Sequence, residues 1–442
     1  MEMNHVETHP GAPCALMKSC PKWTIHPVLS GLILIVAALS VAVAAGEDQP
    51  KDFPGLGKPR TLFVADGDWT QGSWRSLAFT QDNRSLIGSL VRNPGSRTLF
   101  LLGQRGGEVR SFDLAAGNQA SKIVTTGRDM QFEILKARSG ACQEPLLLAR
   151  WRVRKPKEVV VLQFTGEDAR ESVLRHFELP RADEDADVYD CSSPAVAVTP
   201  SADALLLGRG CREWKEGPRS VNWRNDLIWR GDVKAWDVQT GKPRFSDAWE
   251  GNDVLAVAYS TDGKLAAAGG GHRVPTLLPS NDVSGYDGRV VCWGDDYQKR
   301  RFDLALPNHQ VRCLAFSPDS KALVTGGLDG TVKWIDVEQG KIVKSSEVTR
   351  HAGKGSGSIA CLSFSADGRL LAVGVGSSWI GAKWGETFLI DVPKAEVYKV
   401  PSSQEGHVIA CVAFSPDGKY LAAAGMEGIL KLWQIDGGNR PQ

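Results

Sequence analysis

The sequence has almost no net charge and few methionines, tyrosines and histidines. Its 442 residues include 52 Lys and Arg against 51 Asp and Glu, with 5 Met, 6 Tyr and 8 His. A balanced charge excludes a global field that would draw the protein to nucleic acid or to an anionic membrane. We therefore expect no nucleic-acid partner.

The sequence also lacks a catalytic or metal-binding set of residues. No nucleophile, base and metal ligand are grouped in a pattern that would bring them within hydrogen-bonding reach. The histidines after residue 45 do not form a close zinc-type pair; they are His176, His272, His309, His351 and His407. We expect no enzyme activity, no metal and no cofactor.

Glycine and tryptophan are plentiful, with 47 Gly and 14 Trp. Many tight turns and much aromatic packing are typical of sheet-rich repeat proteins. Long helical periodicity is missing after residue 45. The composition therefore favours strands over helices.

A long apolar segment stands near the start of the chain. Residues 28–45 carry no charge, and Lys18 and Lys22 precede them. The segment ends in the small residues of a signal-peptidase site, and it is also nearly long enough to span a hydrocarbon layer of ~30 Å. Residues 1–46 are therefore interpreted as a signal peptide or a retained membrane anchor.

Both interpretations predict export across the cytoplasmic membrane, because positive residues flank the N-terminal side of the segment. We expect a periplasmic, extracellular or membrane-anchored protein that contacts the membrane only through residues 28–45, if they are not cleaved. Translation from Met17 instead of Met1 would leave a short basic region before the apolar core, as secretory signals have. Residues 47–59 are rich in Gly, Pro and charge, which indicates a linker before a folded domain at 60–442.

Two short patterns alternate along this domain. The first is an apolar pair, a larger apolar or aromatic residue and a polar turn, as in LAFSPDS from 314. Its aligned residues are Phe79, Val198, Tyr259, Phe316, Phe364 and Phe414, at spacings of 119, 61, 57, 48 and 50 positions. The first spacing is about twice the others, so a divergent unit with strand-like segments between 131 and 164 makes seven units in all.

The second pattern is a glycine followed by alternating apolar residues, as in GDVKAWD from 231 and GTVKWID from 330. Alternation over about five residues, bounded by Gly or Asp, is the period-two signature of a strand. Each unit is therefore predicted to be a small antiparallel sheet.

Together the two patterns resemble the WD-repeat family, whose unit runs from a Gly-His pair through an apolar-Ala-Phe-Ser-Pro-Asp-Gly turn to a Trp-Asp pair. The resemblance covers residues 60–436 and is strongest at 308–436, while Trp236–Asp237 is the one true Trp-Asp pair at the end of a third strand. It implies an all-β fold, a seven-bladed β-propeller of four-stranded antiparallel blades, and a role in binding partners.

Family members brace each blade with a His, Ser/Thr, Asp and Trp network. In the fifth unit His309, Thr325 and Asp329 match it, and Ile335 takes the Trp position. The seventh unit keeps two of the four positions and departs at two, namely His407 and Trp433 against Ala423 and Glu427. We expect a weaker brace but an intact fold, because contacts between neighbouring units supply most of the stability of a repeat array.

The last unit supplies only three strands, near 408–414, 420–424 and 429–435. The segment 60–66 (RTLFVAD) has strand composition and no unit of its own. We predict that this N-terminal strand completes the last blade and leaves no open edge.

In such propellers the connections between second and third strands share one face with the crossings between blades. The longest insertions fall on this face, at 209–230, 270–287 and 375–384. Exposed aromatics with arginine are typical of interaction hot spots, so we predict a partner-binding face, with self-packing of the loops as the alternative. Its residues are Trp69, Trp74, Trp214, Trp223, Trp229, Trp249, Trp379, Trp384, Arg212 and Arg224.

The sequence thus predicts an exported, monomeric WD-repeat scaffold that binds a protein partner. A propeller enzyme of the lyase, lactonase or quinoprotein type and a glycan-binding module are the alternatives. The segment from Asp237 to Lys242 (DVQTGK) resembles a quinoprotein docking motif, but an ordinary turn between strands explains it more simply.

The 9 cysteines divide by position. Cys313, Cys361 and Cys411 occupy one equivalent inner-strand position in three consecutive units, and we expect them to be small core residues. Cys191 and Cys211 both belong to the third unit, where export would permit a disulfide that holds the long insertion.

Overall fold

The computed structural model describes most of residues 50–435. Outside the described part lie 1–49, 65–71, 93–105, 116–120, 129, 137–145, 153–157, 166–169, 179–187, 192–193, 215–226, 274–285, 295–296, 298, 350–356, 378–383, 402–407, 426–427 and 436–442. The apolar segment 28–45 and the expected signal peptide or anchor are among these. In the described part, no helix is long and apolar enough to cross a membrane.

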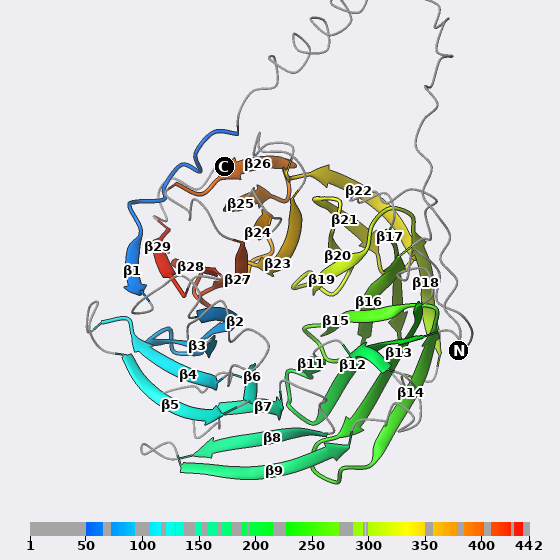
Figure 1. Cartoon of the computed structure of the whole chain (residues 1–442). Helices are drawn as coiled ribbons and strands as arrows, with labels where there is room; N and C mark the ends of the chain where they lie inside the picture. Colours follow the sequence, from blue (N-terminus) through cyan, green and yellow to red (C-terminus); the bar gives the residue numbers. More distant parts are fainter. Residues whose placement is uncertain are drawn as a thin grey trace, which may run out of the picture. The chain divides into compact units, whose positions relative to one another are not determined.

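The described strands of the unit Pro50–Gln442 form seven antiparallel sheets, which are the blades of a propeller (Figure 1). Blade one is β2 (Gly72–Phe79), β3 (Ser85–Arg92), β4 (Gly106–Asp113) and β5 (Ser121–Arg128). Blade two is β6 (Met130–Lys136), β7 (Leu146–Arg152), β8 (Glu158–Thr165) and β9 (Arg170–Glu178). Blade three is β10 (Val188–Cys191), β11 (Ala195–Val198), β12 (Ala204–Trp214), β13 (Leu227–Asp237) and β14 (Pro243–Glu250).

The remaining four blades follow the same plan. Blade four is β15 (Asp253–Tyr259), β16 (Ala266–Arg273), β17 (Tyr286–Trp293) and β18 (Arg300–Leu306). Blade five is β19 (Val311–Phe316), β20 (Ala322–Gly327), β21 (Thr331–Asp336) and β22 (Lys341–Glu347). Blade six is β23 (Ser358–Phe364), β24 (Leu370–Ser377), β25 (Trp384–Asp391) and β26 (Glu396–Lys399). Blade seven is β27 (Ile409–Phe414), β28 (Tyr420–Gly425), β29 (Leu430–Gln434) and β1 (Arg60–Phe63).

Consecutive strands are hydrogen-bonded neighbours throughout five of the blades, the exceptions being blades three and seven, and the innermost strands surround a common axis (Figure 1). The expected all-β fold of seven blades with four antiparallel strands is confirmed. Blade three differs by one addition, because β10 is a fifth strand that pairs with β12.

The first repeated pattern forms the turn between the first and second strands. In blade six, Ser365 Oγ donates to Asp367 Oδ1 at 2.6 Å and accepts a hydrogen bond from the Leu370 N–H at 3.0 Å. Gly368, with a φ of 72°, supplies the left-handed residue that this tight turn needs. The same hydroxyl-to-Asp contact recurs at Thr80, Ser260, Ser317 and Ser415.

Neighbouring blades bury their apolar faces against each other. Between blades five and six, Val324 and Trp334 pack with Val373, Trp384 and Phe388 in one buried cluster. Full burial of one such side chain is worth about 1.5–3 kcal/mol, against about 0.5–1.5 kcal/mol for a typical hydrogen bond. Packing between blades therefore outweighs any single hydrogen bond within a blade.

The brace of blade five matches the expectation from the sequence. His309 is fully buried, with Nε2 at 3.0 Å from Thr325 Oγ1 and Nδ1 at 2.8 Å from Asp329 Oδ1. Burial alone would raise the pKa of Asp329, but hydrogen bonds from His309 and Thr331 hold it below its ordinary value. The network therefore keeps a charged acceptor beneath a buried histidine.

The seventh blade lacks this network in the described part. His407 lies outside the described residues, and the Trp433 Nε1–H donates to the Pro401 carbonyl at 2.9 Å. The indole is thus tied to the chain that crosses between blades, so this blade uses a different hydrogen bond to hold its tryptophan.

The N-terminal strand β1 lies on the outer edge of blade seven. It pairs antiparallel with β29, with Arg60 opposite Leu432 and Thr61 opposite Lys431. Leu62 is buried between blades seven and one, and the ring of Phe63 meets that of Trp74 of blade one edge-on at 5.5 Å. One short strand thus contacts both the first and the last blade.

Residues expected to be a linker also join the fold. The Phe53 N–H donates to the Lys399 carbonyl of β26 at 2.9 Å, and the Phe53 side chain is buried against blades six and seven. Leu56 forms an antiparallel bridge with Ile435. Residues from Pro50 onward therefore belong to the same compact unit as the blades, and the buried ring of Phe53 contacts them within the 47–59 segment.

Deletion of residues 60–66 is expected to give an aggregated or unfolded protein, because it removes a strand of blade seven and exposes the β29 edge. Size-exclusion chromatography with circular dichroism measures the outcome. A monomeric, fully folded deletion variant would contradict the role of β1.

Single substitutions test the same strand. Leu62→Ala, at a side chain 6% exposed, should lower the free energy of unfolding by about 2–5 kcal/mol. Val64→Ala, at a side chain 57% exposed, should cost less than about 0.5 kcal/mol.

Thr325→Val is expected to lower the free energy of unfolding by about 1–3 kcal/mol, because it leaves His309 Nε2 buried without its partner. The matched control is Thr387→Val. Thr387 is fully buried and its Oγ1 has no hydrogen-bond partner in the described part of the chain, so this change should be neutral or stabilising. Urea unfolding midpoints compare the two, and equal effects would show that the brace adds nothing.

Candidate functional site

Three of the tryptophans expected on a binding face are buried. Trp74 is 1% exposed, Trp249 is fully buried and Trp384 is 4% exposed. Each packs in the apolar layer between two blades, Trp74 with Phe112 and Leu430 among others. The prediction that these three rings are exposed was therefore wrong. They stabilise the propeller and are not available to a partner.

The other predicted residues divide into two groups. Trp69, Trp223, Trp379 and Arg224 lie outside the described residues. The backbones of Arg212, Trp214 and Trp229 lie in β12 and β13, where Arg212 is opposite Trp229 and Trp214 is opposite Leu227. These residues are thus close together at one end of blade three.

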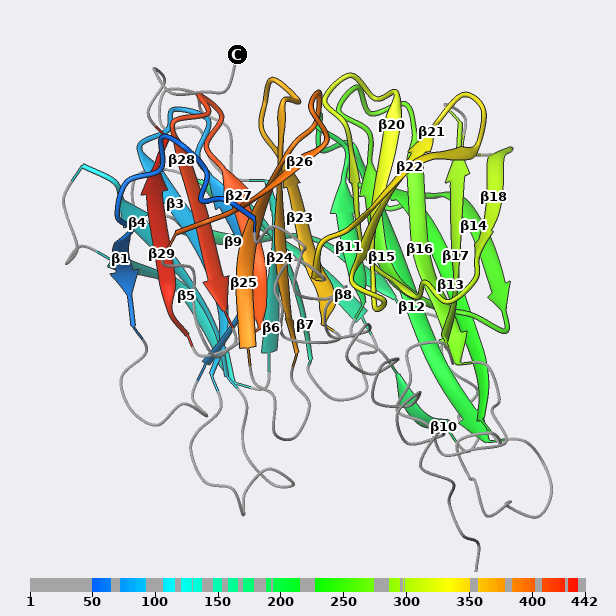
Figure 2. The same ribbon diagram turned by 90° about the horizontal axis from the view of Figure 1, so that it is seen from above.

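Blade three carries a projecting ribbon, formed by the ends of β12 and β13 with β10 beside them. Both long strands have 11 residues, and their register runs from Ala204 opposite Asp237 to Trp214 opposite Leu227. Figure 2 shows this ribbon extending past the strand ends of the other blades. The four pairs beyond Gly210 and Gly231 add about 13 Å at ~3.3 Å per residue. The insertion at 209–230 is therefore partly an ordered hairpin.

The base of the ribbon is fixed by close packing and buried charge. A side chain on Gly210 would overlap the carboxylate of Asp253, a buried residue at the start of blade four. Arg209 is 6% exposed and lies opposite Asp232 in the register. Burial raises the pKa of Asp232, against the lowering effect of Lys234 and Arg209. A ribbon that leaves the blade at this point is therefore held firmly at its root.

The two cysteines of blade three face each other in the strand register. Cys191 of β10 is directly opposite Cys211 of β12, which is a position where antiparallel strands can be cross-linked. The disulfide itself stays a prediction. Intact mass measured with and without reductant distinguishes a disulfide from two thiols. By contrast, Cys313 and Cys411 are free thiols whose pKa values burial raises.

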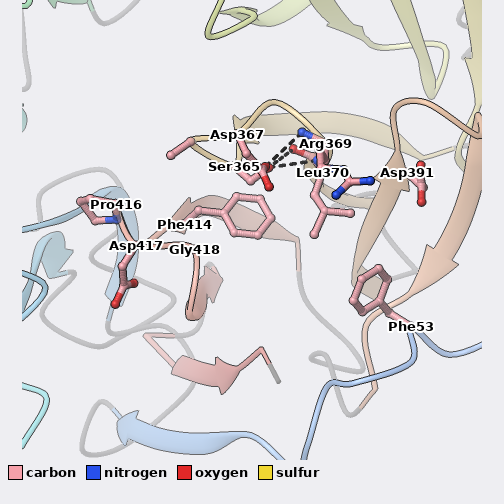
Figure 3. Close-up of a pocket in the computed structure, with 11 residues that line it drawn as sticks. Phe53, Ser365, Asp367, Arg369, Leu370, Asp391, Phe414, Pro416, Asp417 and Gly418 are labelled. Atoms are coloured by element: carbon pink, nitrogen blue, oxygen red, sulfur yellow. Dashed lines mark hydrogen bonds between the residues drawn. The ribbon is translucent and has the colours of Figure 1, made fainter. Parts of the chain in front are cut away.

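A pocket of about 170 Å³ lies between blades six and seven, on the face opposite the ribbon. We call this face the turn face, because it carries the turns between first and second strands and between third and fourth strands. Figure 3 shows Asp391 and Phe53 on one side of the pocket and Pro416 and Asp417 on the other. Its lining residues are Phe53, Ser365, Ala366, Asp367, Arg369, Leu370, Asp391, Phe414, Pro416, Asp417 and Gly418.

The acidic residues of this pocket are held by turns. Asp367 Oδ1 accepts the Arg369 N–H at 3.1 Å, and Asp417 Oδ1 accepts the Lys419 N–H at 3.1 Å. Burial alone would raise the pKa of Asp417, but hydrogen bonds from Ser415 and Lys419 lower it below its ordinary value. The pocket therefore combines carboxylates with apolar walls, and it was not predicted from the sequence.

The described residues include no set of ligands for a metal ion. Within the described ranges, no group of three or more His, Cys, Asp or Glu side chains could hold a metal ion. The fragment Asp237–Lys242 is an ordinary turn, in which Asp237 Oδ1 accepts the Thr240 N–H at 2.8 Å.

Comparison with known proteins agrees with the geometry. The family model of the WD domain, G-beta repeat, matches residues 301–336 and 398–434, which are parts of blades four, five, six and seven. The chain is a WD-repeat β-propeller. The matched stretches are those where the resemblance in the sequence is strongest.

Three curated proteins are similar to parts of this WD-repeat propeller. Apoptotic protease-activating factor 1 of Homo sapiens is 29% identical over 42% of this chain and 14% of its own length. Small ribosomal subunit protein RACK1 of Neurospora crassa is 26% identical over 41% of this chain and 54% of its own length. DENN domain and WD repeat-containing protein SCD1 of Arabidopsis thaliana is 22% identical over 50% of this chain and 20% of its own length.

The WD-repeat propeller thus spans at most about half the length of these relatives. What it shares with them is the repeat fold, which is typical of protein-interaction scaffolds and is generally non-catalytic. The activity and partners of the whole relatives do not follow from a match of this extent.

Proposed function

We propose that this WD-repeat propeller is an exported scaffold that binds a protein partner through the ribbon of blade three and the loops beside it. The projecting ribbon carries the proposal. It presents the backbones of Arg212, Trp214 and Trp229 beyond the strand ends of the other blades (Figure 2). Aromatic and arginine residues on a firmly rooted element bury large area at low entropic cost, as binding hot spots do.

The comparisons support a role in assemblies. One relative is named as a small ribosomal subunit protein and another as a protease-activating factor. Both names refer to proteins that act together with other macromolecules. A partner-binding role for this chain is in keeping with them.

Export is the second part of the proposal, and the apolar segment 28–45 with its basic N-terminal flank supports it. Cell fractionation of the tagged full chain tests it separately from binding. Recovery of the full-length chain in the cytoplasm alone would contradict export. This result would not bear on the proposed binding role.

A capture experiment tests the binding role. The full chain is compared with a shortened variant in which Asn-Gly replaces residues 213–228, so that a two-residue turn joins Arg212 to Trp229. We expect quantitative mass spectrometry of an envelope extract to show at least one protein that the full chain enriches and the shortened variant loses about tenfold. Trp223→Ala with Trp379→Ala should weaken the same capture.

The matched control shortens another connection on the same face. Asn-Gly replaces residues 274–285, joining Arg273 to Tyr286, which also face each other in the register. This variant should keep the partner. Equal partner sets for the full chain and the ribbon variant, with both folded, would refute the ribbon as a binding element.

A further inference from the structure

The pocket between blades six and seven contains a buried carboxylate with a spare oxygen. Asp391 is 5% exposed, and its Oδ1 accepts the Lys394 N–H at 3.0 Å. Among the described residues its Oδ2 has no hydrogen bond or ion pair. An acceptor that no donor of the protein occupies is open to a ligand that supplies one.

Blade three shows what an equivalent carboxylate binds. Asp237 ends β13 as Asp391 ends β25, and its Oδ1 likewise accepts a turn N–H. Its Oδ2 accepts Arg244 Nη2 at 2.9 Å. Arg244 is the bulge residue between Pro243 and Phe245 in β14. The pairing of β26 with β25 has no such bulge, so blade six has no arginine of its own at this place.

The lining of the pocket carries charges of both signs. Asp367, Asp391, Asp417 and Arg369 line it, and Lys419 Nζ pairs with Asp417 Oδ2 at 3.5 Å. The described structure holds no ion pair between Arg369 and Asp391 within 4.0 Å. Lys344 of β22 interacts with Asp391 electrostatically, and in the described residues neither it nor Arg369 forms an ion pair with this carboxylate within 4.0 Å.

The walls and the size of the pocket narrow the class of ligand. Phe53, Leu370, Phe414 and Pro416 offer apolar surface for an alkyl stem, and the two rings favour a cation. The volume of about 170 Å³ is below the roughly 300–1,000 Å³ of sites for drug-sized molecules. The space suits one side chain, not a cofactor.

We propose that this pocket receives one arginine side chain of a partner polypeptide, with its guanidinium on Asp391 and its stem between Phe53 and Phe414. The inference rests on the proposed function as a protein-binding scaffold. It adds a second contact on the turn face, away from the ribbon.

Saturation-transfer difference NMR on the full chain tests the pocket directly. The probe is N-acetyl-arginine amide, and N-acetyl-citrulline amide is the neutral probe of the same shape. We expect saturation of the arginine probe to exceed that of the citrulline probe about five- to tenfold, because charge-assisted hydrogen bonds are the stronger ones. Asp391→Asn, which keeps an acceptor for the Lys394 N–H, should reduce the arginine signal by a similar factor.

The matched control is Asp336→Asn in blade five, where the same turn has Asp336 Oδ1 accepting the Gln339 N–H at 2.7 Å. This variant should keep full arginine binding. Equal signals for arginine and citrulline, or an unchanged arginine signal in a folded Asp391→Asn variant, would overturn the inference. Since the probes need no partner, failure of the capture experiment with intact arginine binding would count against the proposed function alone.

Discussion

The structure depends on closing a ring whose blades are stable only against each other. Each sheet is apolar on both faces, so its burial requires a neighbour on each side. Six of the seven junctions join blades that follow one another in the chain. The seventh joins blade seven to blade one, and there the chain supplies Leu62 and Phe63 from β1 together with Trp74 and Phe112 from blade one.

The N-terminal segment explains how this junction is held. From Phe53 to Phe63 the chain contacts the outer strand of blade six, then β29 of blade seven, and then blade one, where Arg60 donates to the Leu114 carbonyl at 3.0 Å. One segment thus contacts three consecutive blades, and the hydrogen bonds within the blades differ from one blade to another. Blade five keeps its His309 network, while blade seven holds Trp433 through the Pro401 carbonyl.

The fold could be predicted from the sequence because its patterns are local. The Ser-x-Asp turns and the Gly-led strands each fall within a few residues, and they gave seven blades and the candidate closing strand. The exposure of the proposed binding residues was harder to predict, because a tryptophan at a crossing between blades has the same sequence surroundings whether it is buried or exposed. Trp74, Trp249 and Trp384 are buried since the large rings fill the space where two sheets meet.

Two further features of the structure have a counterpart in the sequence. Leu227, Ile228 and Trp229 form an apolar run just before the glycine-led pattern at 231–237, which indicates a strand that begins inside the insertion. Phe53 is a lone aromatic in a polar segment, which is a signal for anchoring. The pocket at Asp391 was not predictable from spacing alone, because its walls come from 53, 370 and 414. The bulge that carries Arg244 in blade three is missing from blade six, and this difference is seen only in the strand register.

Native-state hydrogen exchange of β1 and β29 tests the central claim, that the N-terminal strand closes the ring, most directly. If closure holds the fold together, the amides of Arg60–Phe63 that pair with β29 open only with the whole propeller. Their opening free energy then equals that of the inner strand Ile409–Phe414. Fast exchange in β1, with β29 and the inner strands still protected, would show that the ring is closed without it.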